Sequence, residues 1–405
     1  MERYKFIGTK LNGQESFLVN SFVFFTFWSF FTAFPIAFHG FFRTVLGGRL
    51  GLLILLAQII IFGLYAIQHP RCYSVKNQKY ALVFSFALIF IWLLKALYVS
   101  EFDNGLVSPL FSAAFLILLR DDLKEECMNR FIKVLAVILL LSIIEYLIYI
   151  LSNKGVLLFS NLERFGADDS FTLQIQLYDQ YLFNVVASGT DFPRFQSLCE
   201  EPGVIGTICG FLVYATRGRE DLKFQYFVFV IAGFLSFSLA FYALFAMHFL
   251  TSSKVRGSTL LILALLIVLA YVYLYEFFEY RILFRVQEEG VDNRVTEGFD
   301  MAFSKALSNG ELWWPHDETM SVGAGAKMWL WRNGIISFIV LFLSYAYYYF
   351  GKIKVCKASK KACLVFFLAF WVSFYQRHWI TNLDYLLPFL TIPILYANTA
   401  KVKRN

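Results

Sequence analysis

The chain has 405 residues, of which 59% are hydrophobic, 20% aromatic and 16% charged. Soluble domains are usually about 45–50% apolar and about 25% charged, so this composition excludes an ordinary soluble enzyme. The net charge of +7 lies mainly in short loops between apolar segments, which argues against a nucleic-acid partner. We therefore expect residues 1–405 to form one polytopic membrane domain.

Apolar segments near the ~20 residues that span the hydrocarbon core recur along the chain. The first is too long for a cleavable signal peptide, so we expect a retained helix. The seventh and eighth are short and nearly continuous: they form either two half-length helices that meet at Ser236-Phe-Ser238 or one bent helix. The expected spans are 17–38, 50–68, 80–99, 105–119, 131–152, 203–216, 224–236, 238–251, 258–279, 329–350, 363–374 and 382–399.

Twelve spans place both termini on the same side of the membrane. With that side inside, the internal loops carry roughly twice as many Lys and Arg residues as the external loops, as the positive-inside rule requires. We therefore expect an all-α fold of about twelve transmembrane helices, with the termini and the 351–362 loop in the cytoplasm. Two large loops, 152–202 and 280–328, then lie outside.

Both external loops contain patterns of local structure. In the first, Phe171-Thr-Leu-Gln-Ile-Gln-Leu-Tyr alternates apolar and polar residues, which is typical of an extended segment or an interfacial helix. In the second, Asn293 can cap a helix that Asn309-Gly310 ends. Its apolar face is expected to comprise Val295, Phe299, Ala302, Phe303, Ala306 and Leu307. Trp313-Trp314-Pro315 follows, and this pair suits either the aromatic belt at the membrane interface or stacking on a sugar ring.

Charged residues gather at the expected outer surface. Arg194 is followed by Glu200 and Glu201, and Pro202 then opens a membrane helix. Either carboxylate could simply stabilise that helix N-terminus. Further candidates are Arg294, His316, Asp317, Arg332, Arg377 and His378. Arginine binds phosphate through two hydrogen bonds. The scattered histidines and the absence of a Walker, dinucleotide or HExxH motif predict no metal and no cofactor. The pattern favours a lipid-linked phosphate substrate that is approached from outside.

Four motifs resemble the bacterial O-antigen and exopolysaccharide polymerase family, which is related to the O-antigen ligases. The first runs from Arg194-Phe195-Gln-Ser197 to Glu201-Pro202-Gly203, and the second is Leu235-Ser-Phe-Ser238. The third is Gly323-Ala-Gly325 followed by an aromatic stretch to Gly334, and the fourth is Gln376-Arg377. The resemblance covers roughly residues 190–390, and the first half of the chain is similar in hydropathy only.

The resemblance implies a GT-C-like membrane glycosyltransferase in the bacterial cytoplasmic membrane, with its active site facing outward. Its donor and acceptor are oligosaccharides linked to undecaprenyl diphosphate, and a chain-length regulator and a flippase are its expected partners besides membrane lipid. Leu239 stands where many relatives have Arg or Thr, which puts a phosphate contact there in doubt. Ligases carry Asn-Pro-Asn where this chain has Glu-Pro-Gly, so polymerase is favoured over ligase. A flippase is the other alternative, although we find no internal repeat.

Each candidate residue then has an expected role. The departing diphosphate needs cations, and the acceptor hydroxyl needs a general base. The expected diphosphate ligands are Arg194, Arg294, Arg332 and Arg377, and the expected base is Glu201, with Glu200, Asp317 and His316 as rivals. Trp313, Trp314 and His378 are expected to contact the sugar or the acceptor.

Overall fold

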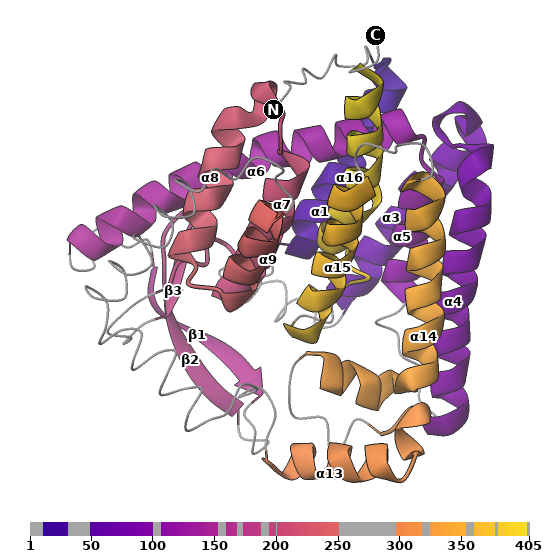
Figure 1. Cartoon of the computed structure of the whole chain (residues 1–405). Coiled ribbons are helices and arrows are strands. Elements are labelled where there is room, and N and C mark those ends of the chain that lie inside the picture. The colour runs from indigo at the N-terminus through magenta and orange to yellow at the C-terminus, as the bar shows by residue number, and fades with distance from the viewer. Residues whose placement is uncertain are drawn as a thin grey trace.

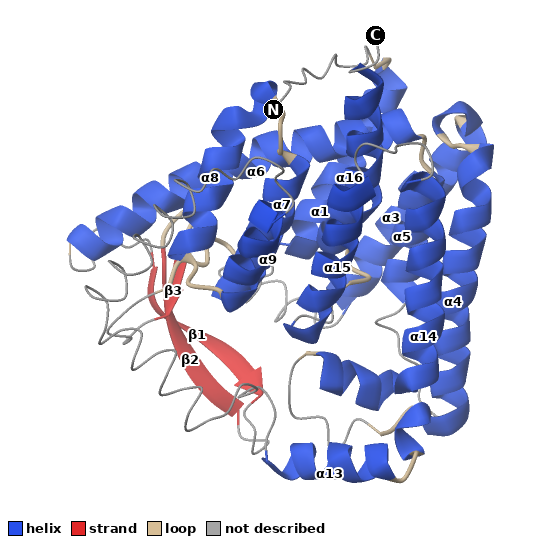
Figure 2. Cartoon of the chain, in the orientation of Figure 1, coloured by secondary structure: helices blue, strands red, loops and turns tan. Residues whose placement is uncertain are grey.

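A computed structural model describes most of the chain as a helical bundle with a small sheet at one end (Figures 1 and 2). The described residues are 11–30, 49–99, 107–152, 159–167, 173–187, 194–199, 201–250, 297–317, 325–353, 360–376 and 380–402. Within them, twelve α-helices and one three-stranded sheet are formed. Eleven of the twelve expected spans coincide with a described helix, and 258–279 lies outside the described residues. The twelfth described helix, Glu297–Ser308, lies in the second large loop (280–328).

The first half of the chain contributes five helices and a sheet. They are α1 (Gly13–Phe30), α3 (Arg49–Gln68), α4 (Val75–Val99), α5 (Val107–Leu118), α6 (Asp121–Leu151), β1 (Phe159–Ala167), β2 (Leu173–Gln180) and β3 (Val185–Ala187). The second half contributes seven helices. They are α7 (Pro202–Ala215), α8 (Lys223–Leu235), α9 (Leu239–Leu250), α13 (Glu297–Ser308), α14 (Ala326–Ile353), α15 (Lys360–Gln376) and α16 (Leu383–Val402). Three short 3₁₀ turns, η1 (Pro70–Cys72), η3 (Glu220–Leu222) and η5 (Glu311–Trp313), join neighbouring helices.

Three of the described helices, α4, α6 and α14, are long and apolar enough to cross a membrane. Large apolar side chains on them are exposed, for example Phe86 (67%) and Leu343 (58%). Contiguous exposed apolar surface is unfavourable in water and favourable in hydrocarbon. The helical class is therefore confirmed and a membrane protein is indicated, while the number of spans and the glycosyltransferase architecture stay predictions.

Helix α7 lies at the centre of the bundle. Every residue from 204 to 215 is buried, which is typical of a helix that is apolar on all sides. Buried tyrosines tie this core together, because their hydroxyls donate to backbone carbonyls of other helices: Tyr214 to Leu244 O at 3.1 Å and Tyr396 to Tyr214 O at 2.9 Å. Such bonds satisfy polar groups that have no water partner inside a membrane.

The described part of the first large loop (152–202) contains an antiparallel sheet in the order β1-β2-β3. The extended alternative for the alternating segment after Phe171 is thus confirmed by β2, and the interfacial helix is wrong. The period of two residues in this segment fits a strand, whose side chains alternate between two faces. Figure 2 shows the strands at the end of the bundle that also holds α13.

Candidate active site at the α8–α9 break

The seventh and eighth apolar segments are two half-length helices, which confirms that alternative. Helix α8 ends at Leu235 and α9 begins at Leu239. Between them Phe237 adopts φ 46°, a left-handed conformation that a bulky residue rarely takes. The break is packed against α7: a Cβ added to Gly206 would lie 2.3 Å from Ser238 Cβ and 2.7 Å from Ser236 Oγ. Only glycine fits at this crossing.

Arg194 binds the C-terminal end of α8. Its Nε donates to the backbone carbonyl of Ser236 at 3.2 Å, and its Nη2 donates to that of Phe237 at 3.0 Å. The adjacent Phe195 N–H donates to Leu235 O at 3.2 Å. The last carbonyls of a helix have no partner within the helix and carry partial negative charge, so a guanidinium stabilises them. The end of the first external loop is thereby fixed to the break.

The residues after Arg194 are buried against α6. Ser197 is fully buried with φ 52°, and its hydroxyl lies 2.8 Å from that of Ser142. Ser197 O also accepts the Val185 N–H of β3 at 2.9 Å. One turn further along α6, Glu145 Oε2 accepts the Phe183 N–H at 2.7 Å. Ser142 and Glu145 on α6 therefore hold two separate parts of the first large loop, one at Ser197 and the other at Phe183.

Sequence reasoning missed this role of α6. Glu145 stands inside an apolar run, where a charged residue is costly and marks function or a specific partner. The sequence shows this unusual position of Glu145, but it does not show that the backbone at Phe183 is its partner. The backbone N–H groups of Leu182 and Asn184 also interact with its carboxylate, so three successive peptide groups surround one anion.

Glu201 occupies the N-cap position of α7 with an extended backbone (φ −144°, ψ 150°), and Pro202 follows in the first turn. Its side chain makes no capping hydrogen bond, although Glu is half-buried there. The carboxylate therefore lies at the mouth of α7 without a capping hydrogen bond to the first turn of that helix. Glu200 lies outside the described residues.

A second group of candidates surrounds a kink in α14. Gly334 adopts φ 80° and ψ 158° and divides this helix into the segments 326–333 and 335–353. Figure 1 shows the first segment lying across the second. Arg332, expected one turn into a span, lies in the short segment of α14 that precedes the kink. A Cβ added to Gly334 would lie 2.6 Å from Trp313 O and 2.8 Å from Trp314 C, so η5 packs directly on the kink.

His316 belongs to this second group of candidates, and its ring is held in one orientation. Its Nδ1 lies 3.0 Å from Trp314 O, and its ring contacts Trp331 in a tilted arrangement, with centroids 4.4 Å apart and an interplanar angle of 32°. A carbonyl can only accept, so Nδ1 carries a proton in this contact. Asp317 is exposed, and its described hydrogen bond is through the backbone, where its carbonyl accepts the Trp331 Nε1–H at 3.0 Å. The ring of His316 is thus held by its contacts with Trp314 and Trp331.

The two adjacent tryptophans are both accessible, with Trp313 46% and Trp314 40% exposed. Trp314 stacks on Tyr98, at the end of α4, with centroids 4.7 Å apart and an interplanar angle of 14°. One face of Trp314 is therefore occupied, and Trp313 is the more open surface for a sugar ring.

Helix α13 packs against this second group of candidates. Phe299, Phe303 and Ala306 are buried in a cluster with Leu312 and Trp331, as the helical period predicted. Leu307 is wrong as a member of that face, since it is 53% exposed. The end at Gly310 is confirmed by its left-handed φ of 74°. Asn293 and Val295 lie outside the described residues.

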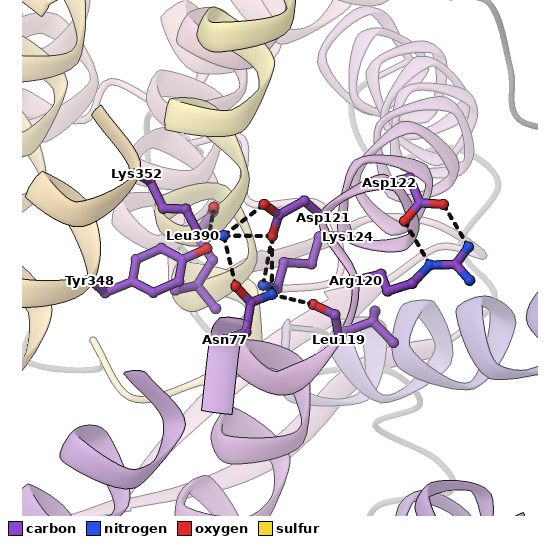
Figure 3. A network of polar contacts seen from close by, with 9 residues as sticks. All are labelled: Asn77, Leu119, Arg120, Asp121, Asp122, Lys124, Tyr348, Lys352 and Leu390. Carbon is purple, nitrogen blue, oxygen red and sulfur yellow. Dashed lines mark hydrogen bonds and ion pairs between the residues drawn. The ribbon is translucent and has the colours of Figure 1, made fainter. Parts of the chain in front are cut away.

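A buried polar network lies at the opposite end of the bundle (Figure 3). Lys352 Nζ donates to Asp121 Oδ2 at 2.6 Å and to Asn77 Oδ1 at 2.8 Å. Lys124, fully buried, lies 3.3 Å from the same carboxylate. The network joins the start of α4, the start of α6 and the end of α14. The sequence did not predict this network, because the convergence of its residues depends on three separate elements.

The structure thus brings Arg194 and Glu201 to one corner, and His316 and Arg332 to another. The α8–α9 break and the first segment of α14 lie at the sheet end of the bundle (Figure 1). The expected ligands Arg294, Arg377 and His378 lie outside the described residues. Within the described part of the chain, no group of His, Cys, Asp and Glu side chains could hold a metal ion.

Comparison of the chain with protein-family models, with curated proteins and with solved structures found no match.

Proposed function

We propose that this protein is a membrane glycosyltransferase that polymerises lipid-linked oligosaccharide repeat units at the outer face of the bacterial cytoplasmic membrane. It transfers the growing glycan from undecaprenyl diphosphate to the sugar end of an incoming unit. The observation that carries the proposal is the docking of Arg194 on the break at 235–238. It joins two motifs of the polymerase resemblance that are far apart in sequence.

Two helix N-termini meet at this corner. Helix α7 begins at Pro202 and α9 begins at Leu239, and the contact of Gly206 with Ser238 holds these helices close together. The N-terminus of a helix carries partial positive charge and unpaired N–H groups, so it favours an anion. Broken membrane helices commonly present such ends to anionic substrates. The two helix N-termini therefore favour a diphosphate at this corner even without the other arginines.

The proposed reaction displaces that diphosphate. The acceptor hydroxyl oxygen attacks the anomeric carbon of the donor glycan, and the bond from that carbon to the diphosphate oxygen breaks. The electron pair leaves with undecaprenyl diphosphate, while the hydroxyl proton passes to the Glu201 carboxylate. Arg194 and Arg332 stabilise the charge that develops on the leaving group, with Arg294 and Arg377 as further ligands in this proposal.

The test is polymer length in cells that carry Glu201→Gln. This change keeps size and hydrogen bonding but removes the base, and a general base contributes about 10²–10⁴-fold in rate. We expect single repeat units and no long ladder at matched protein level. Glu311→Gln is the control, because Glu311 is exposed on η5 at the same end of the bundle.

Two outcomes would contradict the proposal. Normal ladders from Glu201→Gln would remove this residue from the base role and leave His316 as the next candidate. Loss of even the single capped unit, on deletion of the whole gene, would indicate a ligase or a flippase in place of a polymerase.

A further inference from the structure

A groove of about 760 Å³ runs between α4 and α14, away from the candidate active site. Both helices are among the three that can cross a membrane, so the groove faces the bilayer. Its volume falls in the range of about 300–1,000 Å³ that is typical of ligand sites. Among its lining residues are Lys79, Tyr80, Val83, Phe86, Leu343 and Tyr347.

The shape of the groove follows from the residues that line it. Its floor contains small side chains, Ala87, Ser344 and Ala346, which leave space between the two helices. Its rims carry larger apolar side chains that are well exposed, with Phe86 at 67% and Leu343 at 58%. An apolar channel of this kind fits a flexible hydrocarbon chain.

One end of the groove is basic. Lys79 lines it, and Lys76 lies one turn earlier on α4, both with exposed side chains. The Lys79 ammonium lies 5.0 Å from the centre of the Tyr80 ring. The neighbouring Lys352 is already balanced by Asp121 at 2.6 Å. The positive charge at the mouth is therefore supplied by Lys79 and Lys76, beside a wall of aromatic rings.

We propose that this groove binds a membrane phospholipid with an anionic headgroup, its phosphate on Lys79 and one acyl chain between Phe86 and Leu343. Basic pockets between membrane helices on the cytoplasmic side bind anionic headgroups, and anionic lipids are concentrated in that leaflet. The positive-inside rule assigns the Lys76 end of α4 to the same side.

The proposed lipid is distinct from the donor substrate. The groove ends at Gly351, near the end of α14, whereas Arg332 and the kink at Gly334 lie at its start. The site therefore depends on the protein being in a membrane but not on the reaction that it catalyses.

Native mass spectrometry of the delipidated full-length protein in detergent tests the proposal. Phosphatidylglycerol and phosphatidylcholine with the same acyl chains are titrated in parallel. We expect the wild type to bind one phosphatidylglycerol at least about 5-fold more tightly than phosphatidylcholine, a modest effect of one or two cations near a headgroup. Lys79→Gln should remove most of this preference, and Leu343→Trp, which fills the groove, should weaken the binding of both lipids.

Lys223→Gln is the matched control, because Lys223 is exposed on the first turn of α8 and lies outside the groove. It should leave both affinities unchanged. Lys79 and Leu343 are exposed, so their variants should keep the wild-type melting temperature. Equal binding of the two lipids by the wild type would overturn the proposal, and so would an unchanged affinity in either Lys79→Gln or Leu343→Trp.

Discussion

Arg194 and Ser236 are 42 positions apart, and the guanidinium Nε of the first donates to the backbone carbonyl of the second at 3.2 Å. The contact combines two functions in one side chain. It holds the external loop on the end of α8, and it brings a cation to the corner where α7 and α9 begin. A residue that only bound substrate would not need to bond the backbone in this way.

Arg194→Lys should therefore reduce both stability and polymer length. Lysine keeps the charge but lacks the planar fork that reaches two carbonyls at once. Hydrogen bonds to a charged donor contribute about 1.5–3 kcal/mol, so we expect a loss of about 1–2 kcal/mol in thermal unfolding in detergent. Arg71→Lys, at an exposed position within η1, is the control. Wild-type ladders together with a wild-type melting temperature would rule out both roles.

Gly206→Ala should separate α7 from the α8–α9 break. The added Cβ would lie 2.3 Å from Ser238 Cβ, and overpacking of this kind typically costs about 1–3 kcal/mol. Gly63→Ala on α3 is the matched control, because a Cβ there meets nothing within 4 Å. We expect the control to be neutral or slightly stabilising, since alanine favours helix by about 1 kcal/mol. Equal melting temperatures for the two variants would contradict the packing seen at Gly206.

Gly334→Ala should displace the segment that carries Trp313 and His316. An L-residue is strained at φ 80°, and its Cβ would meet the Trp313 carbonyl at 2.6 Å. We expect shortened polymer together with a loss of about 1–3 kcal/mol in stability. Gly298→Ala on α13 is the control, because its Cβ meets nothing within 4 Å. Unchanged ladder length in a folded Gly334→Ala protein would show that this segment is not required for polymerisation.

Asp121→Asn should weaken the network in Figure 3. It leaves Lys124, with a fully buried side chain, and Lys352, 14% exposed, without their carboxylate. Breaking a fully buried pair costs about 3–5 kcal/mol, and because the Asp121 side chain is 41% exposed we expect about 2–3 kcal/mol. Asp122→Asn is the control: its pair with Arg120 is more exposed, and such pairs contribute about 0–1 kcal/mol. A smaller loss for Asp121→Asn than for the control would contradict this account.

Much of the helical order could be predicted, because hydropathy alone marks apolar runs. The alternation over β2 was compatible with a strand or an interfacial helix, and only the structure decides between them. Most of the buried face of α13 followed from its period of 3.6. The kink in α14 could not be predicted, because a glycine inside an apolar run does not by itself indicate a break; the φ of Gly334 goes with the packing of η5 against it. The partners of Glu145 and Asp121 could not be predicted either. Both contacts join segments that are far apart in the chain. Phe183 lies 38 positions from Glu145, and Lys352 lies 231 positions from Asp121.

The Lys352–Asp121 pair also fixes the position of α14 along its own axis relative to α6. Helix α14 is bonded through its last turn to the first turn of α6, so α14 cannot slide along its axis or rotate by one residue without losing these bonds. From Lys352 to Gly334 the helix rises roughly 27 Å at 1.5 Å per residue, about the thickness of the hydrocarbon core. The pair at one end of α14 therefore fixes the position of the kink, and with it that of the Trp313 segment, at the other end of the helix.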